Sequence, residues 1–299
     1  MVLIKKIQGL LLLARPYQWH KNVLVLAALL FSGQLESVSS VQLSLVAFFA
    51  FCLLSSAIYV INDIRDCDDD RHHPVKQKRP LPTGDVTLIH AWVLSIVLLV
   101  CGMLVSFFLG ISFFAAAGAY VVLNGCYTFA LKRIPLLEIF SVAMCYVLRV
   151  VAGAFAIHAP VTPYLLIASM LLSILLILGK RRHERMLFLE TVPLHRPVLA
   201  QYSIQFLDQL TTISAAATLI VYILYTLDEH TRTLTGSSLM PLTIPFVIYG
   251  LFRYLLIVGN LDRGGDPSRD LLLDKPLLAT SLVWVGSIIL IIYSARHSL

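Results

Sequence analysis

The residues with the clearest chemical potential lie between positions 62 and 71, directly after a long apolar run. The stretch reads Asn62-Asp63-Ile64-Arg65-Asp66-Cys67-Asp68-Asp69-Asp70-Arg71 and holds five of the 17 Asp and Glu residues in the chain. Carboxylates gathered at the edge of an apolar helix repel one another unless a cation binds between them. Mg²⁺ is usually held by one or two carboxylates together with substrate phosphates. The stretch therefore predicts a divalent metal site that carries a phosphorylated substrate.

The spacing within this stretch selects among its polar residues. Asn62, Asp66 and Asp70 are spaced by four, so on a continuous helix they share one face, with Asp63 beside them. We expect Asp63, Asp66 and Asp70 to be the metal ligands, and Asn62 to orient the metal shell or a substrate hydroxyl. The other two aspartates lie off this face and are expected to be solvated. The alternative is a solvated acidic helix end paired with nearby cations.

A cationic loop follows the acidic stretch. Residues 71–84 contain several prolines and a glycine, which predicts a shaped loop rather than a helix. Lys76 and Arg79 are candidates for contacts with phosphate oxygens that the metal leaves uncompensated. His72 and His73 suggest a zinc site only weakly, because no second His or Cys pair stands at a suitable spacing.

The composition places these residues in a membrane protein. Of the 299 residues, 58% are hydrophobic and 13% are charged, whereas soluble domains have about 25% charged residues. No Pro-, Gly- or Ser-rich linker and no clear internal repeat divides the chain, so we expect one polytopic all-α domain over residues 1–299. The net charge of +6 is typical of cationic loops at a membrane surface and does not require a nucleic acid partner.

Nine segments are apolar and long enough for a membrane-spanning helix, which needs about 20 residues. They are 18–33, 41–61, 88–109, 111–130, 135–157, 161–179, 208–227, 239–258 and 277–295. The first is short and begins with polar residues. The residues before it lack a small-residue cleavage site and are expected to form an interfacial amphipathic helix.

Positive charge predicts how these spans are oriented. If the N-terminus is cytoplasmic, all 23 Lys and Arg residues except Arg149, Arg232 and Arg296 fall on cytoplasmic segments or in the cytoplasmic halves of their spans. Because Lys and Arg collect in cytoplasmic loops, we expect the N-terminus inside and the C-terminus outside. The three longest connections also lie on the inner face, so an active site is expected there. These connections are about 62–87, 180–207 and 259–276.

Other polar residues are candidates for binding phosphate oxygens. Lys180 and Arg181 open a cationic segment after the sixth span and are expected to bind a lipid phosphate or a sugar phosphate. Arg149 lies within a span, where a cation usually faces a polar cavity or pairs with a partner, so a buried structural network is the alternative. Interfacial roles are alternatives for Tyr127 and Lys132. After Lys180 and Arg181, the further candidates for contacts with phosphate oxygens are Lys21, Lys76, Arg79, Tyr127, Lys132 and Arg149.

The acidic motif has a family resemblance. The spacing Asn62-Asp63-x-x-Asp66-x-x-x-Asp70, followed by Pro74-x-Lys76-x-x-Arg79-Pro80, resembles the first aspartate-rich motif of the UbiA superfamily of intramembrane prenyltransferases. The resemblance covers nearly the whole chain and implies a UbiA-like bundle of nine helices with a cytoplasmic active site. Further segments resemble the superfamily's phosphoribosyltransferases acting on decaprenyl phosphate. They are Arg15–Asn22, Tyr127–Lys132, Leu148–Gly153, Gly179–Glu184, Leu224–Thr226, Arg253–Tyr254, Gly264–Pro267 and Asp274.

The resemblance implies a specific reaction. Such enzymes use Mg²⁺ to transfer 5-phosphoribose from phosphoribosyl diphosphate (PRPP) to a polyprenyl phosphate in the bacterial plasma membrane, and they release diphosphate. In actinobacteria this reaction feeds arabinose donors for the cell wall. The resemblance leaves open whether the enzyme is a homo-oligomer.

Ordinary prenyltransferases of the superfamily carry a second acidic motif after the sixth span. Residues 179–207 of this chain contain no Asp, which favours PRPP over a prenyl diphosphate as the donor. Two alternatives remain open. One is an aromatic prenyltransferase of quinone or haem biosynthesis, and the other is a membrane transporter, which inverted repeats or discontinuous helices would favour.

Overall fold

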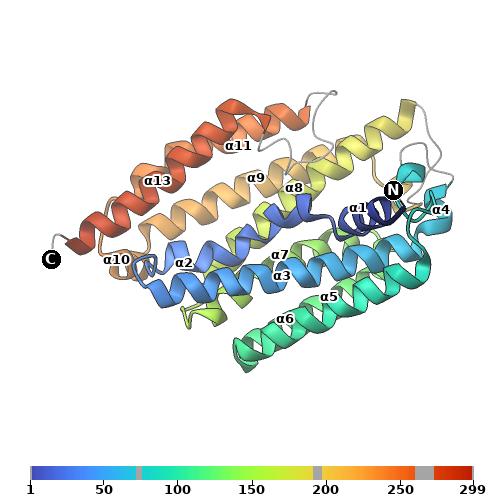
Figure 1. The fold of residues 1–299 in the computed structure, drawn as a ribbon. Helices are drawn as coiled ribbons and strands as arrows, with labels where there is room; N and C mark the ends of the chain where they lie inside the picture. Colours follow the sequence, from blue (N-terminus) through green and yellow to red (C-terminus); the bar gives the residue numbers. More distant parts are fainter. Residues whose placement is uncertain (1, 72–75, 191–196, 260–272, 298–299) are drawn as a thin grey trace. The chain divides into compact units, whose positions relative to one another are not determined.

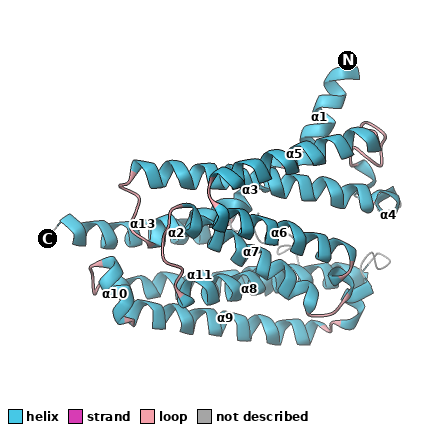
Figure 2. Ribbon diagram, turned by 90° about the horizontal axis from the view of Figure 1, so that it is seen from below, coloured by secondary structure: helices cyan, strands magenta, loops and turns pink. Residues whose placement is uncertain are grey.

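The computed structural model describes residues 2–71, 76–190, 197–259 and 273–297. Within these ranges the secondary structure is helical, with loops between the helices (Figure 2). Eight of the described helices are long and apolar enough to cross a membrane. The chain divides into two compact units, each described here by itself.

The first unit comprises residues 1–28, 37–129 and 148–159. Its elements can be followed from the blue to the green part of the ribbon in Figure 1. They are α1 (Val2–Ala14), η1 (Pro16–Leu26), α3 (Val38–Arg65), α4 (Cys67–Arg71), η2 (Lys76–Lys78), α5 (Leu88–Phe108), α6 (Ile111–Phe129) and the second half of α7 (Leu137–Ala156).

Helices α3 and α5 lie side by side, and small side chains let them approach closely (Figure 1). A Cβ atom at Gly102 would lie 2.7 Å from Leu54 Cδ2, so only glycine fits there without displacing that side chain. The Ser95 hydroxyl donates to the Ala57 carbonyl at 3.1 Å. Large apolar side chains of α5, such as Trp92 and Phe107, are exposed instead. Small residues inside and large apolar ones outside are typical of helices packed in a lipid bilayer.

The second unit comprises residues 29–36, 130–147 and 160–299. It contains part of α2 (Ala27–Phe31) and the first half of α7, and its larger helices pack around Leu175, Ala215, Leu251 and Tyr254. Its other elements are η3 (Leu131–Arg133), α8 (Pro163–Glu190), η4 (Pro197–Gln201), α9 (Ile204–Leu227), α10 (Glu229–Thr235), η5 (Met240–Thr243), α11 (Ile244–Gly259) and α13 (Lys275–His297).

Polar caps decide where several of these helices begin. Ser37, Thr87, Ser203 and Asp228 each accept a hydrogen bond from the backbone N–H three residues later, which satisfies an amide that has no partner within its helix. Asp274 accepts in the same way from Leu277 N at 3.0 Å and caps α13.

The expected span 18–33 is not among the eight candidate spans of the described residues. Its residues form the 3₁₀ helix η1, with Pro16 at its start, and then the five-residue helix α2. Its polar side chains explain the difference, because Trp19 and Asn22 turn toward α3 and bond to Ser56 and Ser55. A segment held by these contacts follows the surface of α3 rather than winding into a long α-helix.

Candidate active site

The acidic stretch does not form one continuous helix. Helix α3 ends at Arg65, Asp66 adopts φ −89° and ψ 6°, and the short helix α4 begins at Cys67. The backbone N–H groups of Asp66 and Asp70 still donate to the carbonyls of Asn62 and Asp66, at 2.9 Å and 2.8 Å, so the expectation that these three residues share one face stays a prediction. Asp63 and Asp70, on either side of the break, are the buried carboxylates of the stretch, with exposed fractions of 4% and 3%.

Apolar packing holds α4 in place behind these carboxylates. Cys67 is buried against Leu13, Val60, Leu81 and Val86. Burial raises the pKa of the Cys67 thiol, so the thiol is neutral at pH 7 and serves as an apolar anchor. Because Cys67 points inward, Asp70, three residues later, also lies on the inner side of α4.

Two arginines neutralise the buried carboxylates. Arg79 NH1 donates to Asp63 Oδ1 at 2.9 Å and to Asp70 Oδ2 at 2.6 Å. Arg15 NH2 donates to the same Asp63 oxygen at 2.5 Å. Buried charges persist only when they are paired in this way, since removing one partner costs about 3–5 kcal/mol. The four side chains form a compact site, the Asp63–Asp70 site, in the first unit.

The backbone around each arginine is fixed. Arg15 has φ 50° and ψ 55°, an uncommon left-handed conformation for a residue with a side chain, and it joins α1 to η1. The Arg79 carbonyl accepts from Thr83 N at 3.1 Å and from the Thr83 hydroxyl at 3.0 Å. The same turn ends at Gly84, whose φ of 81° favours glycine. The predicted shaped loop is thus present among the described residues of 76–84.

The donor chemistry of the Asp63–Asp70 site fits Mg²⁺, which takes hard oxygen ligands. In the described residues, however, no three His, Cys, Asp or Glu side chains are arranged to hold a metal ion. Arg79 bridges the two carboxylates, and Asp66 is half-buried outside the bridge. The oxygen ligands of these residues are of the type that Mg²⁺ prefers, and the Arg79 bridge uses one oxygen of each carboxylate.

Helix η1 is attached to α3 by a series of polar contacts. Trp19 Nε1 donates to Ser56 Oγ at 2.9 Å, and Asn22 Nδ2 donates to Ser55 Oγ at 3.1 Å. The Lys21 ammonium donates to Gln18 Oε1 at 3.1 Å. The polar residues of the Arg15–Asn22 signature therefore position η1, with Arg15 reaching the Asp63–Asp70 site.

Arg149 is part of the same attachment. Its Nε donates to Asn22 Oδ1 at 2.8 Å and its NH2 donates to the Tyr120 hydroxyl at 2.9 Å, while the guanidinium lies 4.7 Å from the centre of the Tyr120 ring. The side chain is 4% exposed. These contacts match the buried network that the sequence left open as the alternative to substrate binding.

Asn62 contacts the end of α6. The Thr128 hydroxyl donates to Asn62 Oδ1, and Arg65 NH1 donates to the Thr128 carbonyl. Tyr127, the residue singled out from the sequence, is half-buried beside Thr128. The side chain of Lys76 and the residues His72, His73, Pro74 and 264–267 lie outside the described part of the chain.

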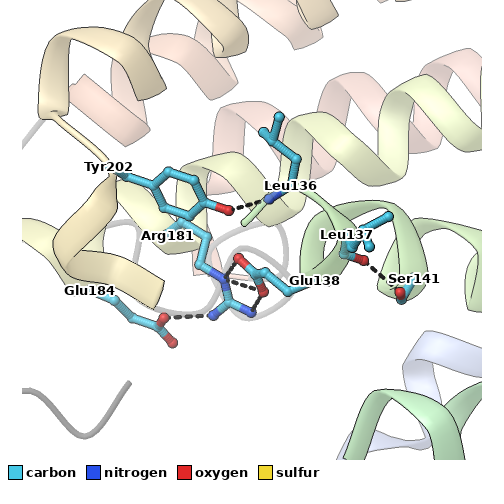
Figure 3. Close-up of polar contacts among 7 residues, drawn as sticks. All are labelled: Leu136, Leu137, Glu138, Ser141, Arg181, Glu184 and Tyr202. Carbon is cyan, nitrogen blue, oxygen red and sulfur yellow. Dashed lines mark hydrogen bonds and ion pairs between the residues drawn. The ribbon is translucent and has the colours of Figure 1, made fainter. Parts of the chain in front are cut away.

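A second cluster of charges lies in the second unit (Figure 3). Arg181 donates to both carboxylate oxygens of Glu138, at 2.8 Å from Nε to Oε1 and 2.5 Å from NH2 to Oε2, and its NH1 donates to Glu184 Oε2 at 2.6 Å. Glu138 is 0% exposed and Arg181 is 3% exposed. Sequence reasoning missed Glu138 as the partner of Arg181, because 43 residues separate them.

Tyr202 is hydrogen-bonded to the backbone two residues before Glu138. Its hydroxyl oxygen accepts from Leu136 N at 2.7 Å (Figure 3), and Leu136 adopts a φ of 63°. Burial raises the pKa of the Tyr202 phenol, which therefore stays neutral at pH 7. Lys132 in η3 and Lys180 in α8 are half-buried. The sequence offered no signal for Tyr202, since a tyrosine in a loop has no characteristic spacing.

Comparison with known proteins identifies the family. The UbiA prenyltransferase family model matches residues 22–180. A decaprenyl-phosphate phosphoribosyltransferase of Corynebacterium glutamicum is 32% identical over 292 residues, which covers 95% of this chain and 87% of that protein. The chain belongs to the UbiA prenyltransferase family.

Other UbiA proteins extend the comparison. The decaprenyl-phosphate phosphoribosyltransferase of Mycolicibacterium smegmatis is 32% identical over 304 residues, covering 96% of this chain and 93% of that protein. Among solved structures, a UbiA homologue from Archaeoglobus fulgidus bound to DMAPP and Mg²⁺ has a TM-score of 0.71 at 19% identity, with 95% of this chain and 99% of that chain covered. This likeness shows that the chain has the UbiA fold.

Proposed function

We propose that this UbiA-family transferase moves 5-phosphoribose from PRPP to a polyprenyl phosphate and releases diphosphate. The observation that carries the proposal is the 32% identity, along 95% of the chain, to a protein named decaprenyl-phosphate phosphoribosyltransferase. The lack of Asp in residues 179–207 supports a donor other than a prenyl diphosphate. A role in supplying arabinose donors for the cell envelope belongs to the same proposal.

The Asp63–Asp70 site would bind the diphosphate group of the donor together with Mg²⁺. Asp63 and Asp70 are the ligands in our proposal, with Asp66 as a third from the helix break. When bound, Mg²⁺ stabilises negative charge on the leaving diphosphate. Arg15 and Arg79 then neutralise phosphate oxygens that the metal does not contact, as guanidinium groups do well.

The acceptor requires little from the protein beyond positioning. A polyprenyl phosphate is already anionic at pH 7, so its oxygen can attack C1 of the ribose without a general base. The bond from C1 to the diphosphate oxygen breaks as the new bond forms, and the diphosphate leaves with its electron pair. Catalysis then rests on orientation and electrostatic stabilisation.

The other anion contacts are assigned by charge and exposure. Lys132 and Lys180, both half-buried, are proposed to bind the lipid phosphate or the 5-phosphate, and Lys21, Lys76 and Tyr127 remain secondary candidates. Arg149 and Arg181 are bound into buried networks, so we assign them to holding η1 and the α7–α8 pair.

The proposed setting is the bacterial plasma membrane. We propose that residues 1–299 act as one functional domain with nine spans, the N-terminus in the cytoplasm, the C-terminus outside and the Asp63–Asp70 site facing the cytoplasm. The positive-inside distribution of Lys and Arg supports this topology. Cytoplasmic access is required because PRPP is a soluble metabolite that cannot cross the bilayer.

A direct assay tests the function. The purified full chain is incubated with Mg²⁺, polyprenyl phosphate and PRPP labelled in the ribose, and the lipid fraction is analysed. We expect a labelled phosphoribosyl lipid and an equal amount of diphosphate. No labelled lipid, together with prenylation of 4-hydroxybenzoate by a polyprenyl diphosphate, would replace our proposal with the aromatic prenyltransferase. PRPP accumulation in proteoliposomes without chemical change would replace it with a transporter.

A further inference from the structure

Thr128 forms a contact with the acidic motif that its sequence position does not suggest. It lies in the last turn of α6, is 2% exposed, and donates its hydroxyl hydrogen to Oδ1 of Asn62 on α3. A threonine hydroxyl has one hydrogen, so this bond uses its entire donor capacity. The contact joins two residues that are 66 positions apart.

Arg65 makes this arrangement rigid. It follows Asn62 by three residues, on the same side of α3, and donates to the Thr128 carbonyl and, at 3.4 Å, to the Phe129 carbonyl. Its guanidinium also lies 4.6 Å from the centre of the Phe129 ring. The end of α6 is thereby held against α3 from two sides, which keeps Thr128 within reach of Asn62.

The bond determines what Asn62 offers to a ligand. An Asn side chain has one carbonyl oxygen, which accepts hydrogen bonds or binds metal, and one NH₂ group, which only donates. With Oδ1 directed at Thr128, the NH₂ group is the part of the half-buried amide that remains for a ligand. An NH₂ group binds an anionic oxygen and cannot coordinate a cation. Asp66 lies one helical turn after Asn62, with its backbone N–H donating to the Asn62 carbonyl at 2.9 Å. Because Asp66 is the third carboxylate of the proposed site, that oxygen belongs to a group bound there.

We propose that Thr128 is a positioning residue, which turns the Asn62 amide so that Nδ2 donates to a diphosphate oxygen of the donor. This inference depends on the proposed function only in that the donor carries a diphosphate group. It assigns Asn62 to the substrate and leaves the metal to the carboxylates. It also gives Thr128, a residue within a span, a part in recognising a soluble substrate.

Binding of inorganic diphosphate with Mg²⁺ to the purified full chain tests the inference by calorimetry, without any need for turnover. Thr128→Val keeps the shape of the side chain and removes the hydroxyl, and Thr128→Ser keeps the hydroxyl. We expect Thr128→Val to weaken diphosphate binding about tenfold, the range of one hydrogen bond to a charged group, and Thr128→Ser to restore most of the affinity. Equal affinities for wild type and Thr128→Val, or no rescue by serine, would overturn the inference.

Asn62→Asp gives a second test that does not require an altered Thr128. It replaces the NH₂ donor with an anionic oxygen, so diphosphate binding should fall by more than in Thr128→Val. If Asn62 were a metal ligand, the added carboxylate would keep or strengthen binding of Mg²⁺ with diphosphate, and that result would overturn the inference. If the wild-type protein does not turn over PRPP, only the proposed function is overturned, because the diphosphate affinities do not depend on which donor the protein uses.

Discussion

Asp63 and Asp70 share one nitrogen of Arg79, although a helix break separates them. The distances of 2.9 Å and 2.6 Å place a single positive centre between the two carboxylates. Arg15 adds a second cation on the Asp63 side. The two aspartates and two arginines together carry no net charge, so Mg²⁺ alone would leave an excess of two positive charges, and Mg²⁺ with diphosphate would not.

Arg79→Ala should therefore separate metal binding from diphosphate binding. Without the guanidinium, each carboxylate loses one counter-charge, and we expect the affinity for Mg²⁺ alone to rise. The affinity for diphosphate should fall by about tenfold or more, because a charge-assisted contact is lost. Mn²⁺ titration followed by electron paramagnetic resonance measures the first, and calorimetry measures the second.

Arg71→Ala is the matched control for Arg79→Ala. Arg71 pairs with the exposed Asp68 at 3.1 Å, and exposed pairs contribute little. The control should leave both affinities at the wild-type level. A higher Mg²⁺ affinity in Arg71→Ala, or an unchanged Mg²⁺ affinity in Arg79→Ala, would contradict the assigned role of Arg79.

Asp63→Asn should lower turnover by at least about 100-fold, the size of effect seen when a preorganised electrostatic contact to the transition state is removed. Asp68→Asn is the control, since the Asp68 side chain is 90% exposed. Both are measured as labelled lipid formed from PRPP. Asp63→Asn leaves Arg15 and Arg79 short of one negative partner, so a thermal unfolding curve must accompany the assay. Normal turnover in Asp63→Asn would show that the reaction does not depend on the Asp63 carboxylate.

The position of this site could be predicted from the sequence, but its internal pairing could not. The density of carboxylates after an apolar run marks residues 62–71. Asp63 and Asp70 are the carboxylates that Arg79 contacts, and nothing in the local spacing shows that contact. In the sequence Arg15 stands out only as part of a signature, because a contact across 48 residues leaves no periodic trace in the chain.

Glu138→Gln should destabilise the protein, with little effect on KM beyond that caused by unfolding. Removing one partner of a buried pair costs about 3–5 kcal/mol, whereas replacing both by apolar residues of similar size is often neutral. We therefore expect Arg181→Met to be as unstable as Glu138→Gln, and the double variant Glu138→Leu/Arg181→Met to recover much of the loss. Thermal unfolding in detergent measures this. If Arg181→Met is stable and has a raised KM, that result would indicate that Arg181 binds substrate.

Gly153→Ala should weaken the attachment of η1. A Cβ atom at this position would overlap the Val25 carbonyl oxygen, and strain of this kind costs about 1–3 kcal/mol. Gly286→Ala on α13 is the control, because a Cβ atom there meets nothing within 4 Å and alanine favours the helix. The unfolding temperature should fall for the first and hold or rise for the second. A neutral Gly153→Ala would show that η1 can shift away from α7.

The membrane helices were largely predictable, and the first segment shows where the prediction stops. Helix α5, predicted at 88–109, is observed at Leu88–Phe108, because an unbroken apolar run of this length has few alternatives. Residues 18–33 form a shorter segment that contains Trp19 and Asn22, whose bonds to α3 determine its path. A hydropathy pattern records how apolar a segment is and does not record which side chains find partners elsewhere.

Arg79 and Arg15 also bear on how the protein is made. A newly synthesised chain has to bring Asp63 and Asp70 into a buried position next to a membrane, where an unpaired carboxylate is costly. Because both counter-charges belong to the same polypeptide, insertion and folding can reach completion before any magnesium arrives. Under the proposed dependence on Mg²⁺, the cellular supply of the ion would set how much of the protein is active and would not set how much of it is assembled.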